Sequence, residues 1–353
     1  MTPRENLLRS LRRQGFETVP LDPNGFCPSQ VEAFKKRFGH DDIAGWFGAP
    51  CRGVWLPLTA TYAAAAELYP RERLPADISF DAFGIGHSRQ PDCYHMTRMH
   101  HPLAGDATLA EIEHHPFPVL SDAAVAHMAR EVAGIQARGL ATMGGMACTI
   151  WETAWYLRGM EDLMADMMDD SPRATVLLDQ VTAIACQLVR AFAKAGCDII
   201  QLGDDIGMQS TPMMNPALWR VWLKPRLAQV IAAGRAVNPD VLIFYHSCGY
   251  VLPFIDELIE IGVDILNPVQ PECMDFAEVH ARFGDRLSFW STIGTQTTLP
   301  FGTPAEVKAV VEKNLRICGA KGGIVIGPTH LVEPEVPWEN LVALKEACDQ
   351  FHF

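Results

Sequence analysis

The segment Ala195-Gly196-Cys197-Asp198-Ile199-Ile200 ends a predicted helix at a glycine and begins an apolar strand after an aspartate. The same order of helix breaker, aspartate and apolar run returns at residues 238–243 and 261–266. The helix-to-strand step recurs at 284–289, and at 319–326 without the aspartate. Strands that are apolar on both faces and alternate with amphipathic helices are typical of a parallel sheet covered by helices.

The chain upstream of this series alternates in the same way. We predict helices over residues 121–138, 152–168 and 171–195, a strand over 141–145, and a further helix that begins at Asn215. With the repeats, these segments make about eight strand–helix units. The predicted fold class is therefore α/β, a closed (β/α)8 TIM barrel with an N-terminal extension, rather than a doubly wound sheet. No Gly-x-Gly-x-x-Gly follows a predicted strand, which counts against a dinucleotide-binding fold.

The first 50 residues are polar and punctuated by proline and glycine, and we expect them to form an N-terminal extension packed on the barrel. Residues 51–353 are predicted as a single (β/α)8 barrel, with candidate strands at 54–58, 80–86 and 94–97 in its first part. Six histidines of this part match no helical ligand pair, and we assign no role to them: His87, His95, His100, His101, His114 and His115.

Composition limits the partners of the chain. It has 353 residues, 48% hydrophobic and 20% charged, with a net charge of −13, which argues against nucleic acid and anionic membranes. No signal peptide or membrane span is evident, so we expect a cytoplasmic protein, with homo-oligomerisation left open. The ten cysteines include no C-x-x-C pair. A metal site must therefore combine ligands from distant segments.

Polar residues follow five successive predicted strands. In a (β/α)8 barrel the carboxyl ends of the strands form the mouth that carries the active site. Chance does not readily explain five polar strand ends in succession, and we place the site there. The residues, in chain order, are Asp204 and Asp205, His246 and Cys248, Asn267 and Gln270, Thr292 and Gln296, and Thr329 and His330.

The run Phe244-Tyr245-His246-Ser247-Cys248-Gly249-Tyr250 brings an imidazole and a thiol to one face of a strand end, because side chains two apart in a strand share a face. His330 follows the last strand and reaches the same mouth. Two imidazoles and a thiolate with one open position are typical of a catalytic zinc site, so His246, Cys248 and His330 are the predicted metal ligands. Hydrogen-bonded structural histidines beside a partly buried cysteine remain the alternative.

Two further cysteines compete for a ligand role. Cys318 follows apolar residues at helical spacing and is predicted to be a core residue. Cys273 lies in a loop after a strand end and is kept as a less favoured ligand.

Three carboxylates are the candidate catalytic groups. Asp204 and Asp205 are predicted as a general acid/base pair, as partners of a metal-bound histidine or as substrate contacts, with capping of a turn as the alternative. Glu152 is predicted as a catalytic group or fourth ligand, with a helix-start role equally open. The predicted substrate-binding residues near the same strand ends are Tyr245, Asn267, Gln270 and Gln296.

These strand ends resemble the uroporphyrinogen decarboxylase superfamily, and more narrowly its branch of cobalamin-dependent methyltransferases. The resemblance covers residues 140–350, and it rests on Gly203-Asp204-Asp205-Ile206-Gly207, His246-Ser247-Cys248-Gly249, Asn267-Pro268-Val269-Gln270-Pro271, Pro328-Thr329-His330 and Pro337-Trp338-Glu339-Asn340. It implies a (β/α)8 barrel and a zinc ion held by His-x-Cys plus a third ligand after the last strand. His330 stands where the methylcobalamin:coenzyme M enzymes carry a cysteine, a departure that disfavours a thiol-methylating role.

The resemblance therefore implies a zinc-dependent methyltransferase that moves a methyl group between a small methylated substrate and a corrinoid (cobalamin) cofactor on a partner protein. Two imidazoles and one thiolate would leave Zn²⁺ with a formal charge of about +1, which favours an oxygen donor such as an O-methyl aryl ether. A decarboxylase-like lyase acting on a carboxylated substrate is the first alternative, although the arginine-rich N-terminal motif R-Q-A-G-R-Y has no match here. A non-catalytic barrel that binds a metal or a corrinoid protein is the second.

Overall fold

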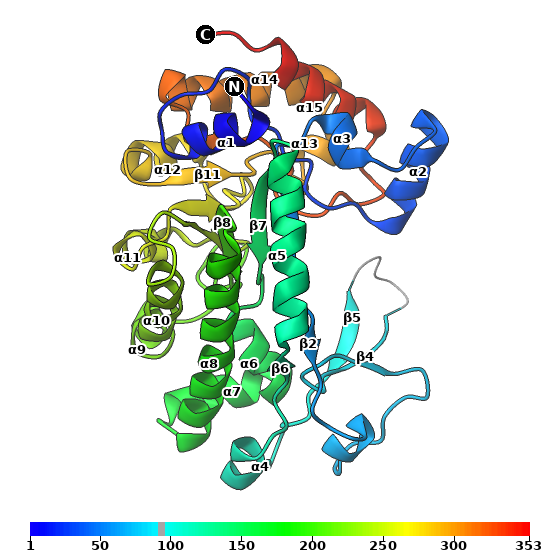
Figure 1. The fold of residues 1–353 in the computed structure, drawn as a ribbon, viewed down its shortest axis with the longest axis vertical. Helices are drawn as coiled ribbons and strands as arrows, with labels where there is room; N and C mark the ends of the chain where they lie inside the picture. The colour runs from blue at the N-terminus through cyan, green and yellow to red at the C-terminus, as the bar shows by residue number, and fades with distance from the viewer. Residues whose placement is uncertain (91–95) are drawn as a thin grey trace.

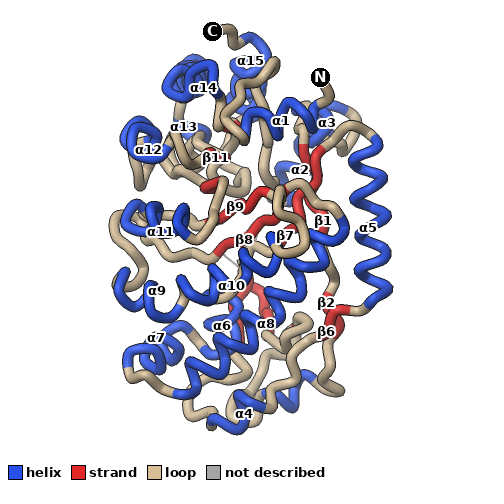
Figure 2. The backbone as a smooth tube through the Cα atoms, turned by 60° about the vertical axis from the view of Figure 1, so that its left-hand side comes forward, coloured by secondary structure: helices blue, strands red, loops and turns tan. Residues whose placement is uncertain are grey.

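A curled parallel sheet that forms part of a barrel organises the protein (Figures 1 and 2). The computed structural model describes residues 1–90 and 96–353. Each adjacent pair of strands in this sheet runs parallel. The seven strands, in sheet order, are β1 (Cys51–Val54), β7 (Ala141–Gly145), β8 (Ile199–Gly203), β9 (Leu242–His246), β10 (Ile265–Asn267), β11 (Ser288–Trp290) and β12 (Ile324–Val325).

The predicted α/β barrel class is confirmed, although the count of eight strands is wrong for the part of the chain that the structure describes. Seven strands belong to the parallel sheet there. Beside β12, the N-terminal segment makes isolated parallel bridges from Leu21 to Ile326 and from Phe26 to Val332. An irregular segment therefore lies where regular pairing of an eighth strand was expected.

Helices surround the strands, as Figure 2 shows. Local sequence sets several of their starts: Ser121 and Ser171 accept N-cap hydrogen bonds, and Thr303 forms a capping box with Glu306. The predicted helix over 152–168 is divided at Gly159, which has a φ of 89°. From residue 122 onward the α-helices are α5 (Asp122–Ala137), α6 (Trp151–Arg158), α7 (Met160–Met168), α8 (Pro172–Ala195), α9 (Pro216–Trp222), α10 (Lys224–Arg235), α11 (Ile255–Glu260), α12 (Phe276–Phe283), α13 (Thr298–Phe301), α14 (Pro304–Cys318) and α15 (Trp338–Gln350).

Helix α8 is long and apolar enough to cross a membrane when judged by length and composition alone. In the fold, 61% of its most apolar window is buried, which is the behaviour of a core helix. The cytoplasmic location stays a prediction.

Strand side chains alternate between two apolar layers. Leu242 and Phe244 of β9 belong to the cluster inside the barrel, whereas Ile243 and Tyr245 belong to the cluster between sheet and helices. The period of two therefore points His246, the last residue of β9, in the same direction as Phe244.

The N-terminal helix α1 (Pro3–Leu11) covers the end of the barrel where the strands begin (Figure 1). Its Leu7 and Leu11 are buried in the interior cluster with the first residues of several strands. Arg4 forms an ion pair with Asp198 just before β8, with 2.7 Å between Nη2 and Oδ1. Two more helices, α2 (Pro28–Phe38) and α3 (Ile43–Phe47), complete the first 50 residues.

Small antiparallel sheets occupy the segment between β1 and β7, at the lower right of Figure 1. The strand predicted over 54–58 is wrong because β1 ends at Val54 and Pro57 cannot donate to a ladder. The strand predicted over 80–86 is also wrong, because Asp81 accepts hydrogen bonds from the amides of Phe83 and Ile85 and closes a loop there. The elements are β2 (Leu58–Thr59), η1 (Ala65–Leu68), β3 (Ser79–Phe80), β4 (Gly86–Arg89), β5 (Thr97–His100), α4 (Leu109–Glu113) and β6 (Val119–Leu120).

Histidines of this segment take part in local hydrogen bonds. The ring of His100 lies between Glu72 and Ser88, at 2.7 and 3.0 Å, and Nε2 of His115 lies 2.9 Å from the carbonyl oxygen of Phe83. His87 and His114 have partners within the segment, Thr97 and the carbonyl oxygen of Ala110, whereas Nδ1 of His101 lies 2.8 Å from the carbonyl oxygen of Tyr156 in α6. His95 and the first two residues of the strand predicted at 94–97 lie outside the described residues.

Candidate metal centre

His246 is held in place by a neighbouring strand. Its Nδ1 lies 2.6 Å from Oδ1 of Asn267, the register partner of His246 on β10. Nδ2 of Asn267 donates to the carbonyl oxygen of Trp290 at 2.9 Å, so the orientation of the amide is fixed and its oxygen faces the imidazole. An amide oxygen only accepts, and Nδ1 of His246 must therefore carry the proton. In the neutral imidazole, Nε2 is then the unprotonated nitrogen and can bind a metal.

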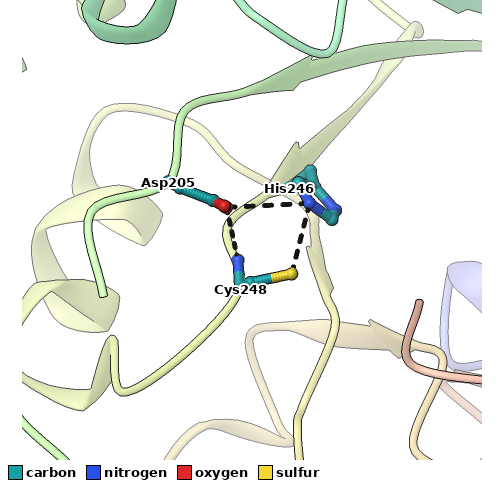
Figure 3. A group of neighbouring side chains, drawn as sticks. All are labelled: Asp205, His246 and Cys248. Atoms are coloured by element: carbon teal, nitrogen blue, oxygen red, sulfur yellow. Dashed lines mark hydrogen bonds and ion pairs between the residues drawn. The ribbon is translucent and has the colours of Figure 1, made fainter. Parts of the chain in front are cut away.

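Asp205 and Cys248 converge on that Nε2 atom (Figure 3). The Cys248 Sγ atom lies 3.6 Å from Nε2 of His246, and Asp205 Oδ1 lies 3.7 Å from it. Asp205 Oδ1 also accepts a hydrogen bond of 2.7 Å from the Cys248 amide, which fixes the two strand ends relative to each other. One ligand atom from each of the three residues lies within 4.8 Å of the other two.

The chemistry of this donor set fits a divalent metal ion such as zinc. Imidazole nitrogen, thiolate sulfur and carboxylate oxygen are the three kinds of protein ligand that zinc takes. Burial raises the pKa of the Cys248 thiol, and Asp205 and Glu152 raise it further. A bound cation would reverse this effect by stabilising the thiolate among the two carboxylates.

The geometry favours Asp205 over His330 as the third donor. Two of the three predicted ligands, His246 and Cys248, come together as expected, but His330 is not in the group within 4.8 Å. His330 is exposed and lines the same cavity as His246. Its role as a ligand stays a prediction.

The two competing cysteines are both accounted for. Cys318 is buried in the layer between sheet and helices, which confirms it as a core residue. Cys273 is half-buried and close enough to Cys248 to contribute to the raised pKa of that thiol, but it is not in the donor group.

Asp204 has a structural position rather than the predicted acid/base one. Its carboxylate is buried and accepts hydrogen bonds from the amides of Ile150 and Glu152 at the start of α6, at 3.1 and 2.9 Å. Burial raises the pKa of Asp204 well above its usual range. The prediction of a general acid/base pair is therefore corrected: Asp204 fixes the first turn of α6, and Asp205 alone reaches the donor group.

Glu152 lies beside the donor group. Its Oε2 accepts from the amide of Asp205 at 3.2 Å, and its Oε1 accepts from the hydroxyl of Tyr156 at 2.8 Å. Burial raises the pKa of Glu152, and the charge of Asp205 adds to the effect. The position is compatible with the predicted catalytic role, which stays a prediction.

A cavity of about 690 Å³ opens next to the metal centre, within the size range of small-molecule sites. His246, Asn267 and His330 line it. Asn267 therefore lies at the cavity, as predicted, and it also holds the imidazole of His246 in place.

Three predicted substrate contacts do not line this cavity. Tyr245 points the other way, with 1% of its side chain exposed, because it is adjacent to His246 in a strand. Gln270 is buried and accepts from the amide of Gly249 at 3.1 Å, which supports the loop of Cys248. Gln296 is exposed and hydrogen-bonds to Gln209 at 3.1 Å. These three predictions are corrected to structural and surface roles.

Several lining residues were missed from the sequence. Gln201 lies on β8, in register with Gly145, and lines the cavity. A polar residue inside an otherwise apolar strand is the sequence feature that could have identified it. Asp22 and Arg52 lie in or beside the N-terminal extension, and the Asp22 carboxylate accepts from the indole of Trp290 at 2.8 Å. Trp55 follows β1 and also lines the cavity.

The fold and the donor group together define a parallel barrel protein with a candidate metal site at the carboxyl ends of β8 and β9. The chain belongs to the uroporphyrinogen decarboxylase (URO-D) family, whose sequence model matches residues 96–351.

Relatives with curated names agree with this family. The uroporphyrinogen decarboxylase of Chlorobium luteolum is 28% identical over 196 residues, which cover 53% of each chain. The uroporphyrinogen decarboxylase of Coxiella burnetii is 25% identical over 181 residues, or 50% of this chain and 46% of the relative. The chain thus spans about half the length of the curated relatives it matches.

A solved structure supports the fold over the full length. A methyltransferase from Methanosarcina mazei superposes with a TM-score of 0.67 and 20% sequence identity, covering 99% of both chains. The N-terminal residues that the family match leaves out are thus part of the same shared architecture.

Proposed function

We propose that this protein is a metal-dependent methyltransferase that moves a methyl group from a small methylated substrate to a corrinoid cofactor on a partner protein. The observation that carries the proposal is the donor group of Asp205, His246 and Cys248, which adjoins a cavity of small-molecule size. The methyltransferase from Methanosarcina mazei, which shares the fold, is consistent with it.

The residues of the chain have separable parts in this reaction. Asp205, His246 and Cys248 would hold the metal, and Asn267 keeps Nε2 of the imidazole available to it. A bound zinc ion would act as a Lewis acid on the heteroatom that carries the methyl group. The cavity would hold the substrate with that heteroatom toward His246.

The ligand set also sets the charge of the site. Zinc held by Asp205, His246 and Cys248 has a formal charge of about zero, whereas His330 in place of Asp205 would leave about +1. The preference for an oxygen donor that the sequence suggested depends on the His330 set. Measuring the metal content of Asp205→Asn and His330→Ala side by side identifies the third ligand. Only the variant that has lost a true ligand should lose metal.

A stoichiometric demethylation assay tests the proposal. The purified protein is mixed with a reduced corrinoid protein and a panel of methylated small molecules, and methylation of the corrinoid is followed by its absorbance. We expect transfer with at least one donor and a loss of at least about 100-fold in Cys248→Ala. The matched control is Cys273→Ala, a nearby thiol outside the donor group, which should retain transfer. Undiminished transfer in Cys248→Ala would contradict the proposal.

A decarboxylase-like lyase is the second candidate, because the family and its curated relatives carry that name. Among the described residues, Arg52 is the one arginine or lysine that lines the cavity, and a substrate with many carboxylates requires more positive partners. Release of CO₂ from a carboxylated substrate, undiminished in Cys248→Ala, would favour this candidate over methyl transfer.

A further inference from the structure

Trp55 is an exposed aromatic residue at the cavity. It follows the last residue of β1, lines the same cavity as His246, and leaves 66% of its side chain exposed. A single exposed apolar side chain is ordinary on a protein surface. Trp55 differs because its surface forms a wall of the candidate substrate site.

Two glycines form a seat for the indole. A Cβ atom added at Gly53 would lie 2.4 Å from Cη2 of Trp55, and one added at Gly145 would lie 2.5 Å from Nε1. Gly53 is in β1 and Gly145 is in the neighbouring β7. The ring therefore lies across two strands, with its benzene edge over one glycine and its pyrrole edge over the other. Any other residue at either position would displace it.

Other walls of the cavity are aromatic as well. Phe244 and Trp290 are buried, line the cavity, and contact each other in a T-shaped arrangement with ring centroids 5.5 Å apart. Polar atoms enter the same space from His246 and Asn267 at the metal centre. The cavity thus combines a polar, metal-binding end with flat apolar surfaces.

We propose that Trp55 stacks on an aromatic ring of the methyl donor, so that the substrate class is a methylated aromatic compound rather than an aliphatic one. This inference rests on the proposed function for the identity of the transferred group. The glycine seat covers one face of the indole, and its exposed area is available to a planar ligand. Aromatic rings prefer such offset-stacked or edge-to-face contacts.

Binding measurements without any corrinoid protein test the inference. Methoxybenzene and methoxycyclohexane are a matched pair of probes, because both carry one methyl ether on a six-membered ring and only the first is flat and aromatic. Titration calorimetry on the full-length protein should show tighter binding of methoxybenzene. In Trp55→Ala that preference should fall by a factor of about three to ten, the range expected for one aromatic contact.

Three variants separate ring stacking from damage to the fold. Trp55→Phe keeps a ring and should retain most of the preference, whereas Gly53→Ala keeps the tryptophan but displaces it and should lose preference as Trp55→Ala does. Phe301→Ala removes another exposed aromatic side chain, 78% exposed and away from the cavity, and should change nothing.

Two outcomes would overturn the inference: equal binding of both probes by the unaltered protein, or a preference that Trp55→Ala leaves unchanged. Either result would still leave methyl transfer from an aliphatic donor to be scored in the corrinoid assay. Conversely, aromatic preference without methyl transfer would support the binding inference and count against the proposed function.

Discussion

One hydrogen bond decides which nitrogen of His246 faces the donor group. Asn267 is fixed by the Trp290 carbonyl and accepts from Nδ1, so Nε2 remains for the metal. The residue type at position 267 was identified from the sequence as functional, but as a substrate contact. Pairwise contacts between strand ends depend on register, and register was not predictable to a single residue.

Asn267→Ala should weaken metal binding by about 10- to 100-fold, because the imidazole loses the partner that fixes its tautomer and orientation. The measurement is a competition titration of the zinc-loaded protein with a chelator of known affinity. Gln201→Ala is the control, since Gln201 lines the same cavity from β8. Equal zinc affinity in Asn267→Ala and the unaltered protein would show that His246 does not need this contact.

At the scale of elements, the best predicted segments are those with local signals. The repeated helix-to-strand step places β8 to β12 within a few residues, because glycine, asparagine and capping residues end and start elements locally. Of the short strands between β1 and β7, β2 pairs with the distant β6, and the adjacent β3, β4 and β5 have no such repeated signal. The burial of Tyr245 could have been predicted from the sequence, because neighbouring residues of a strand point to opposite faces and His246 points into the barrel.

Asp204 links two elements, the end of β8 and the start of α6, and gives a stability prediction. Asp204→Ala should lower the free energy of unfolding by about 2 kcal/mol, because two amides at the helix start, one of them fully buried, lose their acceptor. Urea denaturation followed by circular dichroism measures the change. Asp204→Asn keeps a side-chain oxygen and should cost less. A loss below about 0.5 kcal/mol in the alanine variant would contradict the capping role.

At the scale of the whole molecule, the barrel has one end closed by α1 and the metal centre near the other. Leu7 and Leu11 fill the interior where the strands begin, while Asp205, His246 and Cys248 lie at or just after the ends of strands. The sequence predicted an extension packed on the barrel, but it did not predict that the leucines of this extension insert into the barrel interior. Amphipathic helices do not specify which surface they will cover.

We therefore expect substitutions at the α1 end of the barrel to lower the stability of the protein without changing its metal binding at the other end. Leu7→Ala should destabilise the protein by about 3 kcal/mol through the cavity it leaves, with the zinc content unchanged in the folded protein. Leu8→Ala, on the half-buried face of the same helix, should cost less than half as much. Urea denaturation and elemental analysis give the two quantities. Loss of zinc in folded Leu7→Ala would show that the two ends are coupled.

The central claim is that Asp205, His246 and Cys248 form a metal site. The most direct test is elemental analysis of the purified protein beside His246→Ala, with both shown to be folded by circular dichroism. We expect about one zinc ion, or another divalent metal, per chain in the unaltered protein and less than about a tenth of that in the variant. Metal-free unaltered protein after purification in zinc-containing buffer, or an undiminished metal content in His246→Ala, would contradict the claim.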